Sequence, residues 1–161
     1  MTQTSQTTQV SHARRNDVGQ IITGPSLMSI PSDGYVNGPA TYAFTADVTL
    51  VAGDIVILNS DSQWAKTDAN SASLYIGFKG VVVYGGAADA YILVALPGSI
   101  VTLTDFATLT TGTAYYILEV AGTMGATCPT TGTSGKIQVG VALAADTLYV
   151  TMMGIENVSG A

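Results

Sequence analysis

Apolar and polar residues alternate along most of the chain after residue 40, with the period of two that is typical of β-strands. Tyr42, Phe44 and Ala46 begin this pattern, and short runs rich in Val, Ile, Thr and Tyr follow. Gly, Asp, Asn and Ser separate the runs, and no segment has the apolar spacing of a capped helix. The pattern predicts an all-β fold with strands near residues 55–58, 80–84, 90–96, 113–118, 137–143 and 147–153.

The same order of strand and turn signals occurs twice. Leu50, a two-residue spacer, Gly53 and a strand in the first half are matched by Leu109, a two-residue spacer, Gly112 and a strand in the second. A long polar loop, a glycine-led strand, an Ala-Ala-Asp turn and a closing strand follow in both halves. Such self-similarity indicates one supersecondary unit used twice. We expect a β-sandwich or barrel built from two similar strand–loop–hairpin units, at residues 50–98 and 109–154.

Two pairs of residues in these units carry specific expectations. Gly53 and Gly112 each precede a strand, where a turn often needs the positive φ that glycine adopts at little cost. Tyr115 and Tyr116 are adjacent in a predicted strand, so their rings should lie on opposite faces. One ring should face the core, and the other should face a second sheet or a neighbouring subunit.

The start of the chain lacks this alternation. It is rich in Thr, Gln and Ser and offers little apolar surface to offset the entropy lost on ordering. We expect residues 1–20 to form a flexible, extended N-terminal arm, free or ordered on a partner. Residues 21–161 are expected to form a single all-β body.

Charge divides the chain at the same place. Arg14 and Arg15 give the first sixteen residues a charge of +2, whereas eleven acids and three lysines from Asp17 onward give −8, which together make the net −6. An acidic body repels nucleic acid, so no direct nucleic-acid contact is expected. The arm is suited to an acidic protein surface, with Arg14, Arg15, His12 and Asn16 as candidate contacts.

Little in the chain points to catalysis. The only histidine, His12, lies in the arm, and the only cysteine is Cys128. A catalytic triad, a His/Cys metal site and an internal disulfide are therefore not expected. Asp54, Asp61 and Asp68 lie around the first repeat loop, but their spacing is not that of a calcium-binding loop. We interpret them as turn residues, and we predict no enzyme activity, no cofactor, no metal and, without a long apolar stretch, no membrane contact.

The single tryptophan, Trp64, lies in a polar loop of the first repeat. Together with Asp61 and Tyr75 it would offer a surface on which a sugar ring can stack. A tryptophan in such a loop also commonly covers the end of a core or enters a subunit interface. The sequence leaves both interpretations open.

The second repeat has a further pattern: Leu-x-x-Gly-x-x-x-Tyr followed by two apolar residues, a Thr/Gly/Pro-rich loop, Gly-x-Ile-x-x-Gly-Val-Ala, and an Asp-Thr-Leu-Tyr-Val ending. These motifs lie at residues 109–118, 128–132, 135–142 and 146–150. The pattern resembles the β modules of tailed-bacteriophage virion proteins, namely capsid decoration (cement) proteins, head fibres and some tail-fibre domains. The resemblance extends over Leu50 to Gly154 and leaves out the first forty-odd residues.

The resemblance implies a virion protein that is made in the host cytoplasm and binds the outer surface of a phage capsid, where it stabilises contacts between capsomers. Its expected partners are the major capsid protein and further copies of itself, as a homotrimer or, alternatively, a dimer. The competing interpretation is a phage fibre or spike module that binds host-surface glycans through Trp64, Asp61 and Tyr75.

Overall fold

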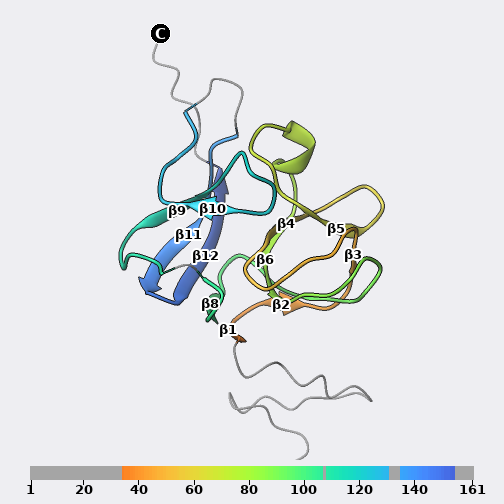
Figure 1. Cartoon of the computed structure of the whole chain (residues 1–161), viewed down its shortest axis with the longest axis horizontal. Helices are drawn as coiled ribbons and strands as arrows, with labels where there is room; N and C mark the ends of the chain where they lie inside the picture. The colour runs from red at the N-terminus through yellow and green to blue at the C-terminus, as the bar shows by residue number, and fades with distance from the viewer. Residues whose placement is uncertain (1–33, 107, 131–134, 155–161) are drawn as a thin grey trace, which may run out of the picture.

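The computed structural model describes residues 34–106, 108–130 and 135–154. They form two six-stranded sheets that pack against each other, which confirms the all-β prediction (Figure 1). The N-terminal sheet has the order β2-β7-β6-β4-β5-β3, with β2 at Ala40–Thr41, β3 at Thr45–Ala46, β4 at Ile55–Leu58, β5 at Gln63–Lys66, β6 at Lys79–Tyr84 and β7 at Leu93–Ala95. The C-terminal sheet has the order β1-β8-β12-β11-β9-β10, with β1 at Gly34–Asn37, β8 at Ile100–Leu103, β9 at Ala114–Ile117, β10 at Met124–Gly125, β11 at Ile137–Ala144 and β12 at Thr147–Gly154. One short 3-10 turn, η1, lies at Ala72–Leu74.

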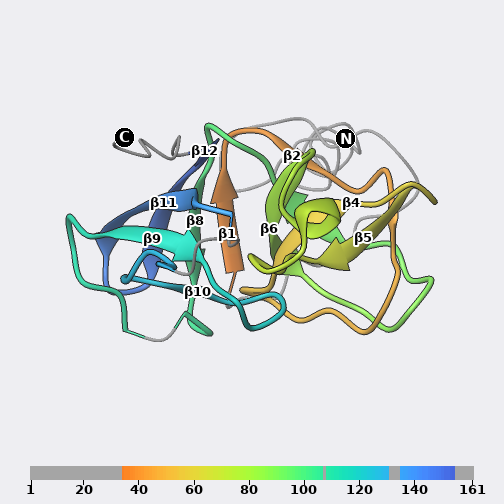
Figure 2. The same ribbon diagram turned by 90° about the horizontal axis from the view of Figure 1, so that it is seen from above.

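The two halves of the chain have the same strand topology. In the first unit, β4 pairs antiparallel with β5 and β6, and β6 pairs antiparallel with β7. In the second unit, β9 pairs in the same way with β10 and β11, and β11 with β12. The fold is thus built from two similar strand–loop–hairpin units. Figure 2 shows these units side by side, with β1 between them.

The glycine before the first strand of each unit makes the same backbone contacts. Gly53 has φ 89° and Gly112 has φ 78°, so the prediction of positive φ is confirmed. The Gly53 N–H donates to the Val82 carbonyl on β6 at 2.8 Å. The Gly112 N–H donates to the Ala142 carbonyl on β11, also at 2.8 Å. These bonds define equivalent positions in the two units, with Val82 of the first unit corresponding to Ala142 of the second.

Two apolar clusters hold the molecule together. A core shared by both sheets contains residues of β4, β6, β7, β8, β9, β11 and β12. A second core lies within the N-terminal sheet, around Leu50, Val56 and Trp64. Strand β6 serves both clusters, since Val81 lies in the shared core and Val82 in the second. Both faces of this strand are therefore covered, and every residue of it except the last is buried.

The N-terminal sheet also closes on itself. Strand β3 pairs with β5, and Thr45 on β3 forms an antiparallel bridge with Tyr91 just before β7. The Ala46 N–H donates to the Ala90 carbonyl at 2.9 Å, next to this bridge. The sheet therefore curls around the second core, whereas the C-terminal sheet has no such closure among the described residues.

The turn of the β9–β10 hairpin connects the second unit to the first. The Gly122 carbonyl accepts from the Ile55 N–H at 2.8 Å, and the Gly122 N–H donates to the Thr67 carbonyl at 2.7 Å. Gly122 has φ 75°, and a Cβ atom there would lie 2.9 Å from Cδ of Lys66. Glycine is thus required both by the backbone conformation and by the close approach.

Several elements differ from the sequence-based expectation. Strand β5 lies inside the segment predicted as a polar loop, because Trp64 and Ala65 are both buried there. The expected strand around residue 44 is reduced to Thr45–Ala46, and neither β1 nor β8 was predicted. The proposed arm, residues 1–20, lies outside the described residues. In the part of the chain that is described, no helix is long and apolar enough to cross a membrane.

Candidate interaction surface

The outer face of the C-terminal sheet is formed by uncharged side chains and is bordered at the β11–β12 turn by the carboxylate of Asp146, which accepts from Oγ1 of Thr147 at 2.9 Å. The strands of this sheet contain no Asp, Glu, Lys or Arg, and successive residues alternate between the shared core and the opposite face. We call the outward set the neutral face. It consists of Tyr35, Asn37, Ile100, Thr102, Ala114, Tyr116, Gln138, Val141, Leu143, Thr147, Tyr149, Thr151 and Met153.

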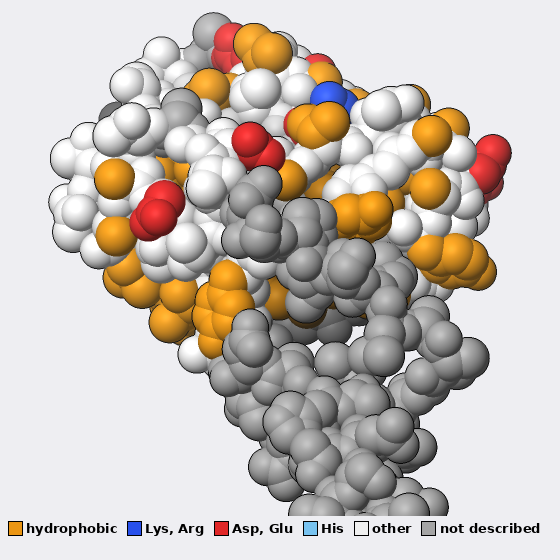
Figure 3. Space-filling view, turned by 60° about the horizontal axis from the view of Figure 1, so that its bottom comes forward, with side chains coloured by type: hydrophobic (Ala, Val, Ile, Leu, Met, Phe, Trp, Pro, Cys, Tyr) orange, Lys and Arg blue, Asp and Glu red, His pale blue; other side chains and the backbone are white. Residues whose placement is uncertain are grey.

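Strand register places Tyr149 near the middle of this face. It lies opposite Ile100 on β8 and opposite Val141 on β11. Tyr35 and Tyr149 are each 40% exposed, and Leu143 is 48% exposed. Aromatic and apolar side chains without charge are typical of the centre of a protein interface. On the side of the molecule seen in Figure 3, acidic side chains lie singly among uncharged and hydrophobic ones.

Polar members of the neutral face bond to one another. The hydroxyls of Thr102 and Thr147 lie 3.0 Å apart across β8 and β12. Nε2 of Gln138 donates to Oγ1 of Thr151 at 3.4 Å across β11 and β12. A polar group that already has a partner loses less when water is removed from it. Covering these four side chains by another surface therefore has a lower desolvation cost.

The equivalent face of the first unit is buried. The backbone contacts and strand register define equivalent positions, first unit then second: Ile55 and Ala114, Val81 and Val141, Val83 and Leu143, Ala95 and Tyr149. The four first-unit residues are at most 2% exposed and lie in the shared core. The four second-unit residues lie on the neutral face and are also apolar or aromatic. The second unit thus keeps an apolar surface at positions that the first unit buries.

No protein-family model and no curated protein matches this chain. The assignment of a function therefore depends on the geometry of its surfaces.

The two adjacent tyrosines of β9 lie on opposite faces of the strand, as predicted. Tyr115 is buried in the shared core, and its hydroxyl accepts from the Thr110 N–H at 2.9 Å. Tyr116 lies on the neutral face. The remainder of this face was missed by sequence reasoning. The available signal was the run of strands in the second half that alternate without any charged residue.

Trp64 does not lie on the surface. Its side chain is 0% exposed and lies in the second core, with the Phe44 ring edge-on at 6.0 Å and the Phe78 ring stacked at 5.8 Å. The hypothesis that Trp64 stacks on a sugar is therefore wrong, because β5 turns the indole inward. Asp61 lies in the exposed turn between β4 and β5, and Tyr75 follows η1.

The aspartates of the first repeat loop have separate structural roles. Asp54 is 8% exposed, accepts from the Val51 N–H at 2.9 Å and pairs with Lys66 at 3.2 Å. Asp68 accepts from the Asn70 N–H at 2.8 Å. Among the described residues, no group of three or more His, Cys, Asp or Glu side chains is placed to hold a metal ion.

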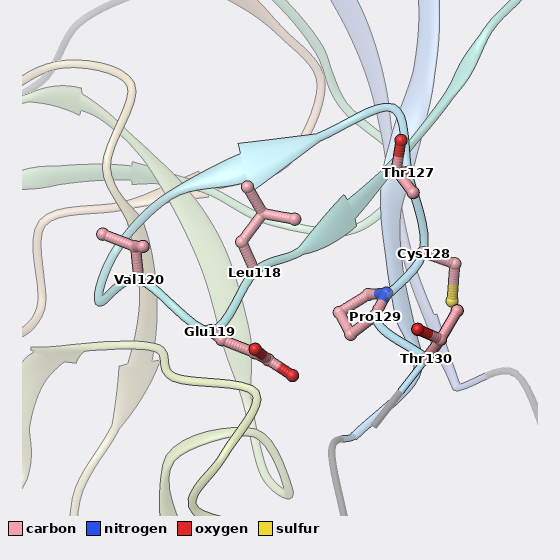
Figure 4. A pocket seen from close by; sticks show the side chains of 7 residues that line it. All are labelled: Leu118, Glu119, Val120, Thr127, Cys128, Pro129 and Thr130. Carbon is pink, nitrogen blue, oxygen red and sulfur yellow. The ribbon is translucent and has the colours of Figure 1, made fainter. Parts of the chain in front are cut away.

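A hollow of about 360 Å³ lies beside the β9–β10 hairpin. Figure 4 shows its lining, which comes from the hairpin turn on one side and from the segment after β10 on the other. Most of the lining is apolar, with Leu118, Val120 and Pro129, and the partly exposed free thiol of Cys128 lies among them. The candidate capsid contacts Arg14, Arg15, His12 and Asn16 lie outside the described residues.

Proposed function

We propose that this protein is a structural protein of a tailed-phage virion, a decoration protein that binds the outer capsid surface and stabilises contacts between capsomers. The observation that carries the proposal is the neutral face, a broad uncharged sheet surface backed by the shared core. Surfaces of this kind on an otherwise acidic body are suited to burial in an assembly.

The uneven charge distribution supports a capsid partner. Residues 17–161 have a charge of −8, whereas Arg14 and Arg15 give the first sixteen residues +2. Arginine forms bidentate pairs with carboxylates, so these residues, with His12 and Asn16, are suited to an acidic surface of the major capsid protein. The resemblance to decoration proteins points in the same direction, and it favours a homotrimer.

The alternative of a glycan-binding fibre or spike module has lost its main contact. Stacking on a sugar needs an exposed aromatic ring, and Trp64 is fully buried. Asp61 and Tyr75 remain partly accessible, but neither has the indole beside it as a stacking platform. We therefore propose no glycan-binding function.

Binding to capsids assembled without this protein tests the proposal. The full chain should co-sediment with such capsids to saturation, and electron microscopy should show added density on the outer surface. Replacing Arg14 and Arg15 together by Gln should weaken binding by about tenfold or more, because each charge-assisted pair contributes about 1.5 kcal/mol or more. Lys136→Gln in the body is the matched control and should bind normally. A full chain that leaves the capsids bare would overturn the proposal.

A further inference from the structure

We propose that the neutral face is the surface through which copies of this chain associate with one another. The inference deepens the proposed function, on which it rests for its biological setting, by naming the partner of that face. Three observations carry it: the equivalence of the two units, the occupancy of their inner faces, and the distribution of charge.

The first observation is what covers the same face in the other unit. Val81 and Val83 of β6 are 0% and 2% exposed because the C-terminal sheet packs on them. Their equivalents, Val141 and Leu143 of β11, have no described part of this chain packed over them, and Leu143 is 48% exposed. The two units share one topology, so this face is built to be covered by protein in both.

The second observation concerns which protein surface can cover it. Within the chain, the face of the first unit that is equivalent to the neutral face packs on the opposite, core-facing side of the second unit. Because two different faces meet, this is a head-to-tail contact. A further copy cannot continue this stacking, because it has no free face of the kind that would pack on the neutral face. In its first unit that face encloses the second core around Trp64, and in its second unit that face lies in the shared core. The neutral face of one copy therefore meets the neutral faces of others, closed around a symmetry axis.

The third observation is electrostatic. Eleven acids and three lysines give residues 17–161 a charge of −8, and the described strands that form the neutral face contain none of them. The carboxylate of Asp146 borders the face at the β11–β12 turn, where it accepts a hydrogen bond from Thr147. Two acidic bodies repel where their carboxylates meet, and a buried unpaired charge is strongly disfavoured. A contact between neutral faces avoids both costs. It also keeps the basic arm available for an acidic capsid surface.

The test is the mass of the full chain in solution, measured by light scattering during size-exclusion chromatography. We expect two or three times the 16.5 kDa of one chain. Tyr149→Asp places a charge in the middle of the neutral face and should weaken association by about a hundredfold or more, because the charge would be buried without a partner. Tyr91→Asp is the matched control, since Tyr91 is 63% exposed and lies off this face. The control should remain oligomeric.

Leu143→Lys gives a second variant at an exposed position of the same face, in case Tyr149→Asp does not fold by circular dichroism. A wild-type chain that is monomeric across a dilution series would overturn the inference, as would folded face variants that remain oligomeric. Capsid binding separates the two proposals. If the wild type is oligomeric but does not bind capsids, the proposed function alone is contradicted. If it is monomeric and saturates capsids, this inference alone is contradicted.

Discussion

The two units of this protein share a strand topology but differ in which faces of their strands are buried. In the first unit, residues on both faces of β6 are buried, Val81 toward the C-terminal sheet and Val82 toward the second core. In the second unit, Ala142 of β11 is buried, while its neighbour Val141 is only partly covered and lies on the neutral face. Duplication of a sheet that is covered on both faces in the first unit leaves the neutral face of the second unit uncovered by the described residues.

The tryptophan explains why the first unit has a core of its own in addition to the shared core. Trp64 of β5 fills the second core and packs against Phe44 and Phe78. The equivalent strand of the second unit, β10, is the two residues Met124–Gly125, with no large ring. Among the described residues, the second unit has no separate core, and its buried side chains lie in the shared core.

The largest expected effect comes from removing that ring. Trp64→Ala should lower the free energy of unfolding by about 3–5 kcal/mol, because it empties the centre of the second core. Denaturant unfolding measures the loss. Tyr91→Ala, at a position that is 63% exposed, should change the free energy of unfolding by about 0.5 kcal/mol or less. A loss near that of the control would mean that the second core does not depend on Trp64 and that the comparison of the units is wrong.

A second prediction compares two equivalent glycines. A Cβ atom on Gly140 would clash with the Tyr149 carbonyl, and one on Gly80 would clash with Val94 and the Ala95 carbonyl. Gly140→Ala and Gly80→Ala should each lower the free energy of unfolding by about 1–3 kcal/mol, because the paired strands must move apart. Thermal or denaturant unfolding of both variants checks this. If Gly140→Ala left the free energy of unfolding unchanged while Gly80→Ala lowered it, β6 and β11 would be packed differently in the two units.

The smallest expected effect concerns Lys79, a charged residue of β6 in a position where β11 has no charge. Lys79 is 8% exposed, its Nζ donates to the Gly77 carbonyl at 2.6 Å, and burial lowers its pKa below 10.5. Between the lowered pKa and 10.5, the unfolded chain binds a proton that the folded chain has released. The free energy of unfolding therefore rises with pH in this window. Below the window, the buried Lys79 ammonium destabilises the fold to its full extent.

Comparison with Lys79→Met measures this penalty. The wild type should gain stability relative to the variant as the pH rises from the lowered pKa toward 10.5, as judged by denaturant unfolding at each pH. Burial also raises the pKa of Tyr42, but Tyr42 is present in both proteins and its contribution cancels in the difference. An identical pH dependence of the two proteins would show that the Lys79 ammonium is not penalised by its burial.

The repeat was the most informative feature of the sequence. Leu50, Gly53, Leu109 and Gly112 predicted both units and the positive φ of both glycines, because turn chemistry is local and recurs with the motif. The burial of Trp64 was not predictable in this way. Most of its neighbours in sequence are polar, and the pairing of β5 with β3 and β4 turns the indole inward. The neutral face depends likewise on strand register, which brings Ile100, Val141 and Tyr149 together from three segments.

The closure of the N-terminal sheet has a consequence for the way this protein can meet other chains. A strand with unpaired N–H and C=O groups along its edge is a template for uncontrolled pairing with other chains, and fibres grow in this way. Here the bridge between Thr45 and Tyr91 engages the backbone of β3 on the side away from β5. Another chain that approaches this sheet from the β3 side therefore meets side chains rather than an unpaired backbone edge.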